Sequence, residues 1–434
     1  MNEWNLYVEN FGKIDKAEIA VRPFTLFIGD NNSNKSYMMS LIYGIINLDL
    51  INNPLYKFEK DDDDYIVCKK WFKEIEYANK IDLTKREFYS LNKLLNKLLN
   101  KNKNMFIKSI FNEKIEIEKI NVEFKYISKI SLAKQEVNSE KRYILSIGET
   151  NITFGEVIYK DNELLIKLLL QAIIRATYNA DIMGEKVGYY LPTSRTGFLL
   201  TRKTLVKSSI EDKFNEGISE KNLLIRPCSD FLSEISSISI KELNEQFKDI
   251  VKLIENEIIE GSVKVDSITN EIMYLPEGGN EAMPMFISSG VITEITPLIL
   301  MLKYKKGIKA LMIEEPEMCL HPKLQCLIAK VMIRIVNKKL PVLLTTHSDN
   351  ILQYINNMIK LNNNSDKKEL MKKYNYEEQD IISSDKIAMY QFDVHNHKTS
   401  INKLECGDYG FEAETFNNML IKLLKESRAF NMEE

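Results

Sequence analysis

The segment FTLFIGDNNSNKSYMMSLI, residues 24–42, joins a continuous apolar run, a polar loop and apolar residues at helical spacing. In the loop, Gly29, Lys35 and Ser36 match the phosphate-binding pattern G-x-x-x-x-G-K-[ST], whereas Asn34 stands where the second glycine belongs. A strand that passes through such a loop into a helix directs backbone amides and a lysine toward an anion. The segment therefore predicts a phosphate loop beside a sheet that is buried on both faces.

The composition is that of a folded chain without a global attraction to nucleic acid or membranes. Its 434 residues, 44% of them hydrophobic, suffice for two or three domains or for one large domain with insertions. Lys and Arg (59) nearly balance Asp and Glu (62), so any nucleic-acid surface must be local. We expect a soluble, cytoplasmic protein, because the sequence shows neither a signal peptide nor an apolar membrane span.

The five cysteines form no C-x-x-C pair, which argues against a disulfide framework and a zinc site. They are Cys68, Cys228, Cys319, Cys326 and Cys406. The acidic run from Asp61 to Asp64 offers carboxylates to a metal ion, but nothing near it supplies the oxygen geometry of a calcium loop. We interpret that run as a solvated loop.

Changes of pattern along the chain predict one domain interrupted by an insertion. Two half-exposed strands, WNLYVENF and KAEIAV, precede the phosphate loop, and later segments alternate between helical and strand spacing. We expect residues 1–50 to form the N-terminal part of this domain, 51–186 a helical and mixed insertion, 187–280 a middle segment with helical and β elements, 281–360 the remaining motifs, and 361–434 a closing strand and helix.

The segment ALMIEEPE, from Ala310 to Glu317, reads as an apolar strand that ends in carboxylates. Parallel strands bring their C-terminal ends to the same sheet edge as a phosphate loop. From order and spacing, Glu314 would support Mg²⁺ through its water ligands, and Glu315 would orient or deprotonate a hydrolytic water. Considered alone, EEPE is equally consistent with a charged turn after a strand.

Two further segments are candidates for the same site. His347 ends the buried strand PVLLTTHSD, and one helix with one return strand would bring its imidazole to the edge that carries Glu315. Most histidines at strand ends are structural hydrogen-bonding groups, but this position favours a role at the site. Ser288, Ser289 and Gly290 precede an apolar helix, where small hydroxyls and amides form either an anion site or an ordinary serine cap.

Taken together, GDNNSNKS, ISSGVITE, LMIEEPE, MCLHPKLQ and TTHSD resemble the phosphate loop, signature, Walker B motif, D-loop and switch histidine of ABC-type ATPase heads. The closest resemblance is to the RecF, SMC and OLD-like branch, in particular to single-head bacterial AAA ATPases of anti-phage systems such as Septu, PARIS and the OLD nucleases. NFGKIDKAEI and YYLPTSRTG are also typical of that branch. Each motif alone is weak, but the joint match in the right order is specific.

The resemblance implies an α/β fold of the P-loop NTPase class. It predicts an ABC-ATPase head with a central, mostly parallel sheet, an antiparallel β subdomain and a helical insertion. Such heads bind ATP and Mg²⁺ and pair across a two-fold axis, so that each ATP lies between one phosphate loop and the signature of the partner. Because this pairing closes on itself, we expect a homodimer or a higher oligomer.

Carried over by position, the resemblance gives catalytic roles to Lys35, Glu315 and His347. Lys35 would contact the β- and γ-phosphates, and His347 would sense the γ-phosphate. Ser36 and Glu314 would serve the Mg²⁺ ion. The expected nucleotide-binding residues are Gly29, Asn31, Asn32, Ser33, Asn34, Lys35, Ser36 and Tyr37.

The resemblance places the signature residues in trans. Ser288, Ser289 and Gly290 would reach the ATP that the other subunit holds. Arg195 in PTSRTG would line the site or, in the plainer interpretation, remain an exposed loop arginine. No glutamine is assigned to the Q-loop.

Three functions are consistent with this resemblance. The first is a slowly hydrolysing ATPase whose paired heads regulate a separate effector, a nuclease or a toxin, in bacterial anti-phage defence. The second is a RecF-like DNA clamp, for which Arg202, Lys203 and Lys207 are candidate phosphate contacts or a solvated face. The third is a scaffold that holds nucleotide with little turnover. The segment after His347 contains no D-x-D, so we expect no nuclease in this part of the chain.

Asn34 is the main departure from the phosphate-loop pattern. If the usual glycine supplies a left-handed backbone, asparagine replaces it well; if the glycine supplies closeness to the phosphates, the added side chain crowds them. We predict that nucleotide binds through Lys35 and the helix N-terminus, with reduced affinity or turnover. An Asn34→Gly variant should then bind labelled ATP more tightly or hydrolyse it faster. Equal binding and equal hydrolysis would remove any functional meaning from the substitution.

Overall fold

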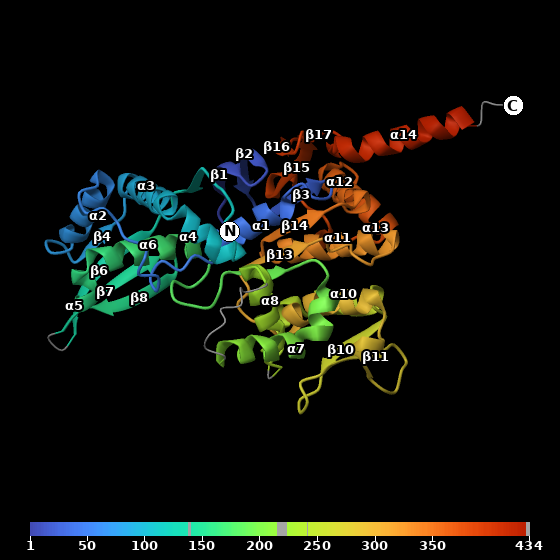
Figure 1. Cartoon of the computed structure of the whole chain (residues 1–434), viewed down its shortest axis with the longest axis horizontal. Coiled ribbons are helices and arrows are strands. Elements are labelled where there is room, and N and C mark those ends of the chain that lie inside the picture. The colour runs from blue at the N-terminus through green and yellow to red at the C-terminus, as the bar shows by residue number, and fades with distance from the viewer. Residues whose placement is uncertain (138–139, 215–223, 241, 431–434) are drawn as a thin grey trace. The chain divides into compact units, whose positions relative to one another are not determined.

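The computed structural model describes residues 1–137, 140–214, 224–240 and 242–430, without the side chains of residues 206–214 and 414–421 (Figure 1). The chain divides into two compact units. The first comprises Met1–Arg22, Ser40–Tyr189 and Gly307–Ala310, and the second comprises Pro23–Met39, Tyr190–Lys306 and Leu311–Glu434. No helix of the described ranges is long and apolar enough to cross a membrane.

The first unit contains an antiparallel sheet in the order β5-β1-β2. Its strands are β1 (Trp4–Phe11), β2 (Ile14–Val21) and β5 (Lys119–Phe124). Trp4, Leu6 and Val8 alternate along β1 and are fully buried, the pattern of a sheet with one covered face. Both predicted N-terminal strands are therefore confirmed.

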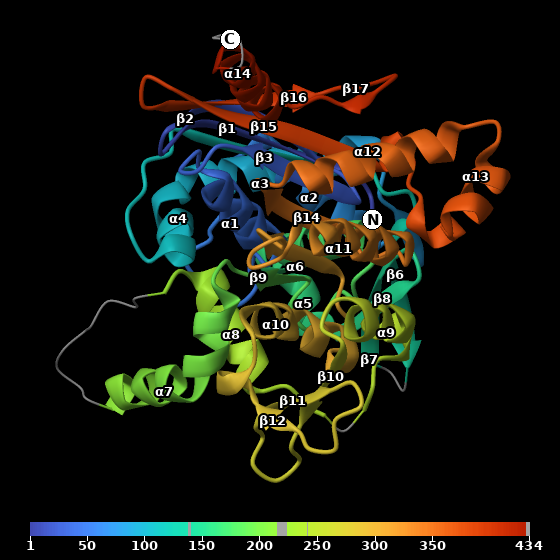
Figure 2. The ribbon, with the colours of Figure 1, turned by 90° about the vertical axis from the view of Figure 1, so that its right-hand side faces the viewer.

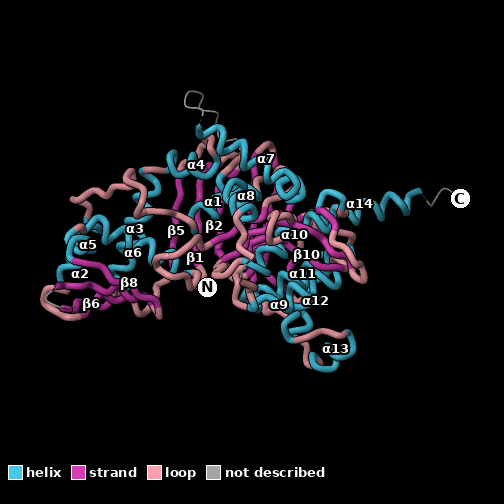
Figure 3. The backbone as a smooth tube through the Cα atoms, turned by 90° about the horizontal axis from the view of Figure 1, so that it is seen from below, coloured by secondary structure: helices cyan, strands magenta, loops and turns pink. Residues whose placement is uncertain are grey.

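The rest of the first unit combines several helices with a second antiparallel sheet. A sheet in the order β4-β6-β7-β8 lies beside several helices, as Figure 3 shows. The strands are β4 (Lys80–Asp82), β6 (Ile130–Val137), β7 (Glu140–Ile147) and β8 (Thr150–Gly155), and the helices are α2 (Asp63–Glu74), α3 (Lys85–Lys101), α4 (Lys103–Phe111), α5 (Glu156–Lys160) and α6 (Asn162–Thr177).

The acidic run of this unit begins a helix, so its interpretation as a solvated loop is wrong. The Asp62 side chain accepts a hydrogen bond from the Asp64 amide at 2.9 Å and caps α2. Lys97 lies 2.6 Å from Asp62 and 2.8 Å from Asp64. Carboxylates near a helix N-terminus are favourable because they accept hydrogen bonds from its free amides and are attracted by the partial positive charge of that end.

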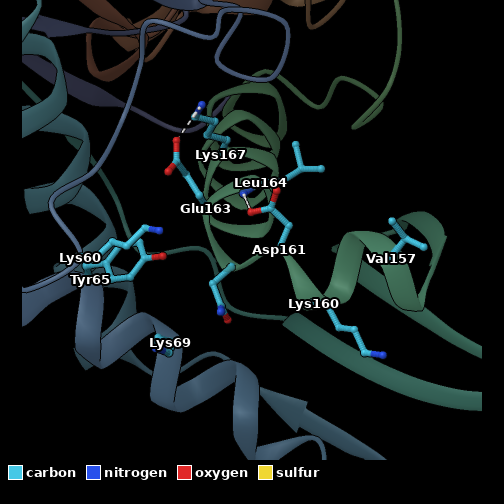
Figure 4. Close-up of a pocket in the computed structure, with 10 residues that line it drawn as sticks. Lys60, Tyr65, Lys69, Val157, Lys160, Asp161, Glu163, Leu164 and Lys167 are labelled. Atoms are coloured by element: carbon cyan, nitrogen blue, oxygen red, sulfur yellow. Dashed lines mark hydrogen bonds and ion pairs between the residues drawn. The ribbon is translucent and has the colours of Figure 1, made fainter.

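A cavity of about 690 Å³ opens beside the start of α6 (Figure 4). Four lysines contribute to its lining, but two of them have acidic partners: Lys167 lies 3.2 Å from Glu163, and Lys160 lies 3.2 Å from Glu156. Asp161 caps α6 by accepting a hydrogen bond from the Leu164 amide at 3.1 Å. Two of the four lysines and Asp161 are therefore already engaged in ion pairs or hydrogen bonds within the unit itself. The lining residues are Lys60, Tyr65, Lys69, Val157, Lys160, Asp161, Asn162, Glu163, Leu164 and Lys167.

The second unit is built on strands in the order β16-β15-β3-β14-β13. Four of them run parallel: β3 (Phe24–Gly29), β14 (Val342–Thr346), β13 (Ala310–Glu314) and β15 (Ile387–His395). The antiparallel strand β16 (Lys398–Leu404) lies next to β15, as Figure 2 shows. Every residue of β3, β13 and β14 is buried, as expected for parallel strands covered on both faces. The expected α/β fold is confirmed.

Helices follow the strands in the order that the motifs predicted. The phosphate loop leads into α1, β13 is followed by α11, and β14 is followed by α12. The helices are α1 (Lys35–Ile46), α7 (Arg195–Phe214), α8 (Arg226–Ser236), α9 (Lys248–Glu257), α10 (Gly290–Tyr304), α11 (Pro322–Asn337), α12 (Asp349–Asn363), α13 (Lys367–Tyr374) and α14 (Glu414–Phe430).

Gly29 shows why the first glycine of the loop is required. Its φ angle is +131°, and a Cβ at this position would lie 2.2 Å from the carbonyl oxygen of Phe392 on β15. Residues with a side chain avoid such backbone angles, and a strand carbonyl cannot move aside at low cost. Gly29 therefore lets two parallel strands pack closely where the chain turns into the phosphate loop.

Candidate nucleotide-binding site

The phosphate loop surrounds the ammonium group of Lys35. Lys35 Nζ donates hydrogen bonds to the carbonyl oxygens of Gly29 at 3.0 Å and Asp30 at 2.7 Å, and to Ser33 Oγ at 3.1 Å. Gly29, Ser33 and Lys35 are buried, while the other expected contacts lie nearer the surface. Asn31, Asn32, Ser36 and Tyr37 are exposed, and Asn34 is half-buried.

Asn34 has the backbone conformation that a glycine would supply. Its φ angle is +68°, and that of Asn32 is +60°, both in the left-handed region that asparagine tolerates better than most residues. The Asn34 carbonyl accepts the first helical hydrogen bond of α1, from the Met38 amide at 3.1 Å. Geometrically, Asn34 is therefore a substitute for a left-handed glycine. Whether its side chain crowds the phosphates stays a prediction.

Glu314 ends β13 and is held by residues of the YYLPTSRTG segment. Its two carboxylate oxygens accept hydrogen bonds from the Tyr190 hydroxyl at 2.7 Å and from the Thr193 amide at 3.0 Å. A carboxylate offers about four lone-pair positions, so Glu314 can still accept hydrogen bonds from water. This environment suits the expected contact with Mg²⁺ through water ligands.

Glu315 and His347 contact each other across the ends of β13 and β14. His347 Nε2 lies 3.5 Å from Glu315 Oε1, and the Glu315 amide donates to the Thr345 carbonyl at 3.0 Å. The His347 imidazole, Lys35 and Arg195 hold the pKa of the Glu315 carboxyl below its usual range, although burial opposes them. Glu315 is therefore ionised at neutral pH, as a residue that orients or deprotonates water must be.

Glu317, which sequence analysis did not assign to the site, holds the main chain of His347. Its Oε1 accepts hydrogen bonds from the His347 amide at 2.7 Å and from Thr346 Oγ1 at 2.8 Å. Its other oxygen is buried without a hydrogen bond in the described part of the chain. Burial raises the pKa of this carboxyl. Its place in EEPE was the only available signal, because the sequence does not show which acid turns inward.

The ammonium group of Lys35 interacts electrostatically with acidic residues of the separate motifs. Burial lowers the pKa of the Lys35 ammonium to about 8, while nearby carboxylates favour its charged form. The strongest of these comes from Glu315, followed by Asp30, Glu317 and Glu314. The structure thus brings together the predicted lysine, both predicted acids and the predicted histidine at one end of the parallel strands.

The predicted signature residues lie at the exposed N-terminus of α10. Ser289 and Gly290 are exposed, and Ser288 is half-buried. Ser289 occupies the N-cap position, but its side chain makes no capping hydrogen bond. The alternative of an ordinary serine cap is therefore wrong for Ser289, and the end of this helix keeps free amides that can receive an anion.

Arg195 is buried, so its interpretation as an exposed loop arginine is wrong. It is 2% exposed and forms an ion pair with Glu294, at 3.1 Å between Nη2 and Oε1. Its Nη1 and Nη2 also donate to the carbonyl oxygens of Glu314 at 2.6 Å and Glu315 at 3.1 Å. Sequence analysis missed this structural role because an arginine in a loop gives no signal of burial.

The residues present fit Mg²⁺ that arrives together with a nucleotide. The described residues contain no group of three or more His, Cys, Asp or Glu side chains that could hold a metal ion. Mg²⁺ is commonly bound through one or two protein oxygens, waters and substrate phosphates. The exposed Ser36 hydroxyl and waters held by Glu314 would complete such a shell.

The basic stretch considered for DNA binding is largely engaged within the chain. Arg202 donates to the carbonyl oxygens of Leu199 and Asn270, each at 3.1 Å. Lys203 lies 2.9 Å from Glu271. The side chain of Lys207 lies outside the described residues.

Residues 4–352 match the protein family described as AAA ATPase domain. A comparison with curated proteins finds no match. Among solved structures, an SMC head bound to the C-winged helix domain of ScpA is similar at a TM-score of 0.40 and 11% identity, over 93% of this chain and 98% of that one. The SMC head domain from Thermotoga maritima gives 0.34 and 12%, over 93% and 100%. An Smc head domain with an extended coiled coil, bound to the C-terminal domain of ScpA derived from Pyrococcus furiosus, gives 0.35 and 11%, over 98% and 99%.

Nucleotide binding should depend on pH through Lys35. Because the pKa of its ammonium is about 8 and a triphosphate favours the charged form, ATP binding should take up a proton above that pH. Below pH 8 Lys35 is already charged, so its titration should not change the affinity; above pH 8 the affinity should fall by up to about tenfold per pH unit. Titration calorimetry in two buffers of different ionisation enthalpy measures this uptake. A Lys35→Arg variant stays charged and is the control; no proton uptake by the unmodified protein above pH 8 would contradict the prediction.

Proposed function

Because the chain belongs to the AAA ATPase domain family, we propose that it is an ABC-type head that binds ATP with Mg²⁺ and hydrolyses it slowly. The convergence of Lys35, Glu315 and His347 at the ends of β3, β13 and β14 carries this proposal. Lys35 would bind the phosphates, Glu315 would orient or deprotonate the attacking water, and His347 would sense the γ-phosphate.

Two features of the loop and the acid support slow turnover. Asn34 places a side chain where the phosphate-loop pattern has a glycine. The Glu315 carboxylate must also be shared between the His347 imidazole and the water that it would activate. The first feature would crowd the phosphates, and the second would leave the carboxylate less available to water, so both would lower turnover.

We propose further that two copies pair through their heads. The exposed N-terminus of α10 supports this, because the free hydroxyl of Ser289 and the first amides of a 15-residue helix suit a phosphate of a second molecule. In a two-fold pair, each signature would face the nucleotide of the other copy, and two identical contacts would close the assembly.

Head pairing predicts a complementation between two inactive variants. Lys35→Ala should lose phosphate binding, and Ser289→Arg should block the signature, so each alone should hydrolyse little ATP. In a mixture, a heterodimer combines the intact loop of one chain with the intact signature of the other, and activity should return at one of its two sites.

A mass measurement tests the same pairing directly. Glu315→Gln should hold ATP and give the mass of a dimer, whereas Lys35→Ala should not. Failure of the mixture to regain activity, or a monomeric Glu315→Gln protein with ATP, would contradict pairing.

We propose that the paired heads control a separate effector, a nuclease or a toxin, in bacterial anti-phage defence. The resemblance of the motifs to anti-phage ATPases supports this part. The alternative of a DNA clamp has less support, because Arg202 and Lys203 are engaged within the chain. A nucleotide-holding scaffold remains the alternative if hydrolysis is absent.

The effector should be encoded beside this protein. We expect the product of an adjacent nuclease or toxin gene to co-purify with the ATP-loaded Glu315→Gln protein and to be retained differently by Lys35→Ala, because only the former holds paired heads. Affinity purification of both variants, co-expressed with the neighbouring gene, measures this. Equal retention would show binding without nucleotide control. Salt-sensitive DNA binding without a protein partner would favour the clamp instead.

A further inference from the structure

A buried ion pair in the second unit has no role in the scheme above. Arg195 and Glu294 are 2% and 1% exposed, and their charged groups lie 3.1 Å apart. The Arg195 amide donates to Glu294 Oε1 at 3.1 Å, and Arg195 Nε donates to the Glu294 carbonyl at 3.1 Å. A buried pair of charges is not by itself a source of stability, so its position calls for another explanation.

One end of this pair supports the hydrolytic acid. Arg195 donates to the carbonyl oxygens of both Glu314 and Glu315, and to that of Pro192 at 3.0 Å. Glu315 has a φ angle of +41°, which residues other than glycine seldom adopt. A peptide in such a conformation persists only when its surroundings hold it. The planar guanidinium spans these acceptors together, which a lysine ammonium cannot do.

The other end supports the helix that carries the signature. Glu294 lies in the first turns of α10, and its Oε2 accepts hydrogen bonds from the Thr196 amide at 2.9 Å and the Thr196 hydroxyl at 2.8 Å. That hydroxyl also lies 2.9 Å from the Thr293 hydroxyl. At the tip of α10, a Cβ on Gly290 would lie 3.7 Å from Cys319 Sγ, in the turn that follows Glu315. The tip of the helix thus lies beside the acidic turn, and Arg195 joins the two through hydrogen bonds.

We propose that Arg195 and Glu294 are a positioning pair that makes the signature helix and the Glu314–Glu315 turn move as one body. A shift of the signature, which would face the nucleotide of the partner, would then also shift the Glu315 carboxylate in the same chain. The proposal rests on the proposed head pairing for its functional meaning, while the mechanical link belongs to a single chain.

The test removes the pair without leaving a lone buried charge. In the double variant Arg195→Met/Glu294→Gln, amide hydrogen exchange measured by mass spectrometry should accelerate by about tenfold in both segments, 290–296 and 314–320. The matched control is Arg334→Met/Asp380→Asn, which removes another buried pair of the same unit, 2.6 Å apart between Arg334 Nε and Asp380 Oδ1. The control should leave exchange in those two segments unchanged. Acceleration in only one segment would overturn the proposal.

The turnover number, kcat, distinguishes a positioning role from a purely structural one. In the test variant kcat should fall by about tenfold, while the affinity for labelled ATP should stay within about twofold, since Lys35 and its loop are untouched. The single variant Glu294→Gln keeps the shape of the side chain and should show a smaller fall in kcat. It replaces the double variant in this test if the double variant does not fold. An unchanged kcat would overturn the positioning role. If the unmodified protein neither hydrolyses ATP nor pairs, the proposed function fails, and the exchange experiment still decides the link.

Discussion

The buried ammonium of Lys35 lies among several acidic side chains, and their charge constrains what can enter the site. Glu314, Glu315 and Glu317 all act on the buried Lys35 group from the ends of neighbouring elements. A triphosphate that entered alone would add negative charge to a region of low dielectric, where repulsion is several times stronger than in water. Under the proposed function, a divalent cation must therefore accompany the nucleotide and reconcile its phosphates with the acids.

The two acids nearest His347 lie in opposite environments although only one residue separates them. The imidazole and Lys35 stabilise the ionised form of Glu315, whereas burial raises the pKa of Glu317 and favours its proton. Their contacts differ accordingly: Glu315 meets the side chain of His347, and Glu317 holds its main-chain amide. Separation of pKa values between neighbouring carboxyls is a common way to assign them different tasks. Under the proposed function, Glu315 is the acid that would act on a reacting water, while Glu317 holds the main chain of His347.

Local sequence pattern could predict the strands and the order of the motifs, because each depends on residues adjacent in the chain. The apolar runs that became β3, β13 and β14 were visible, and so were the acids and the histidine at their ends. The contacts of Arg195 and Glu317 could not be predicted, because burial of a charge depends on partners from distant segments. The acidic run at the start of α2 shows an error of another kind, in local structure. Its carboxylates were interpreted as part of a solvated loop, but Asp62 caps a helix whose apolar pattern is weak.

The two glycine positions of the phosphate loop impose different physical demands, and only one of them can be met by another residue. At Gly29 the neighbouring strand leaves no room, because the Phe392 carbonyl occupies the place of a Cβ. At Asn34 the demand on the backbone is only a left-handed turn, which costs most residues about 1–2 kcal/mol and asparagine less. The loop can therefore keep its path around Lys35 without the second glycine. Any functional effect of Asn34 must then come from its side chain against the phosphates, since its backbone already has the required form.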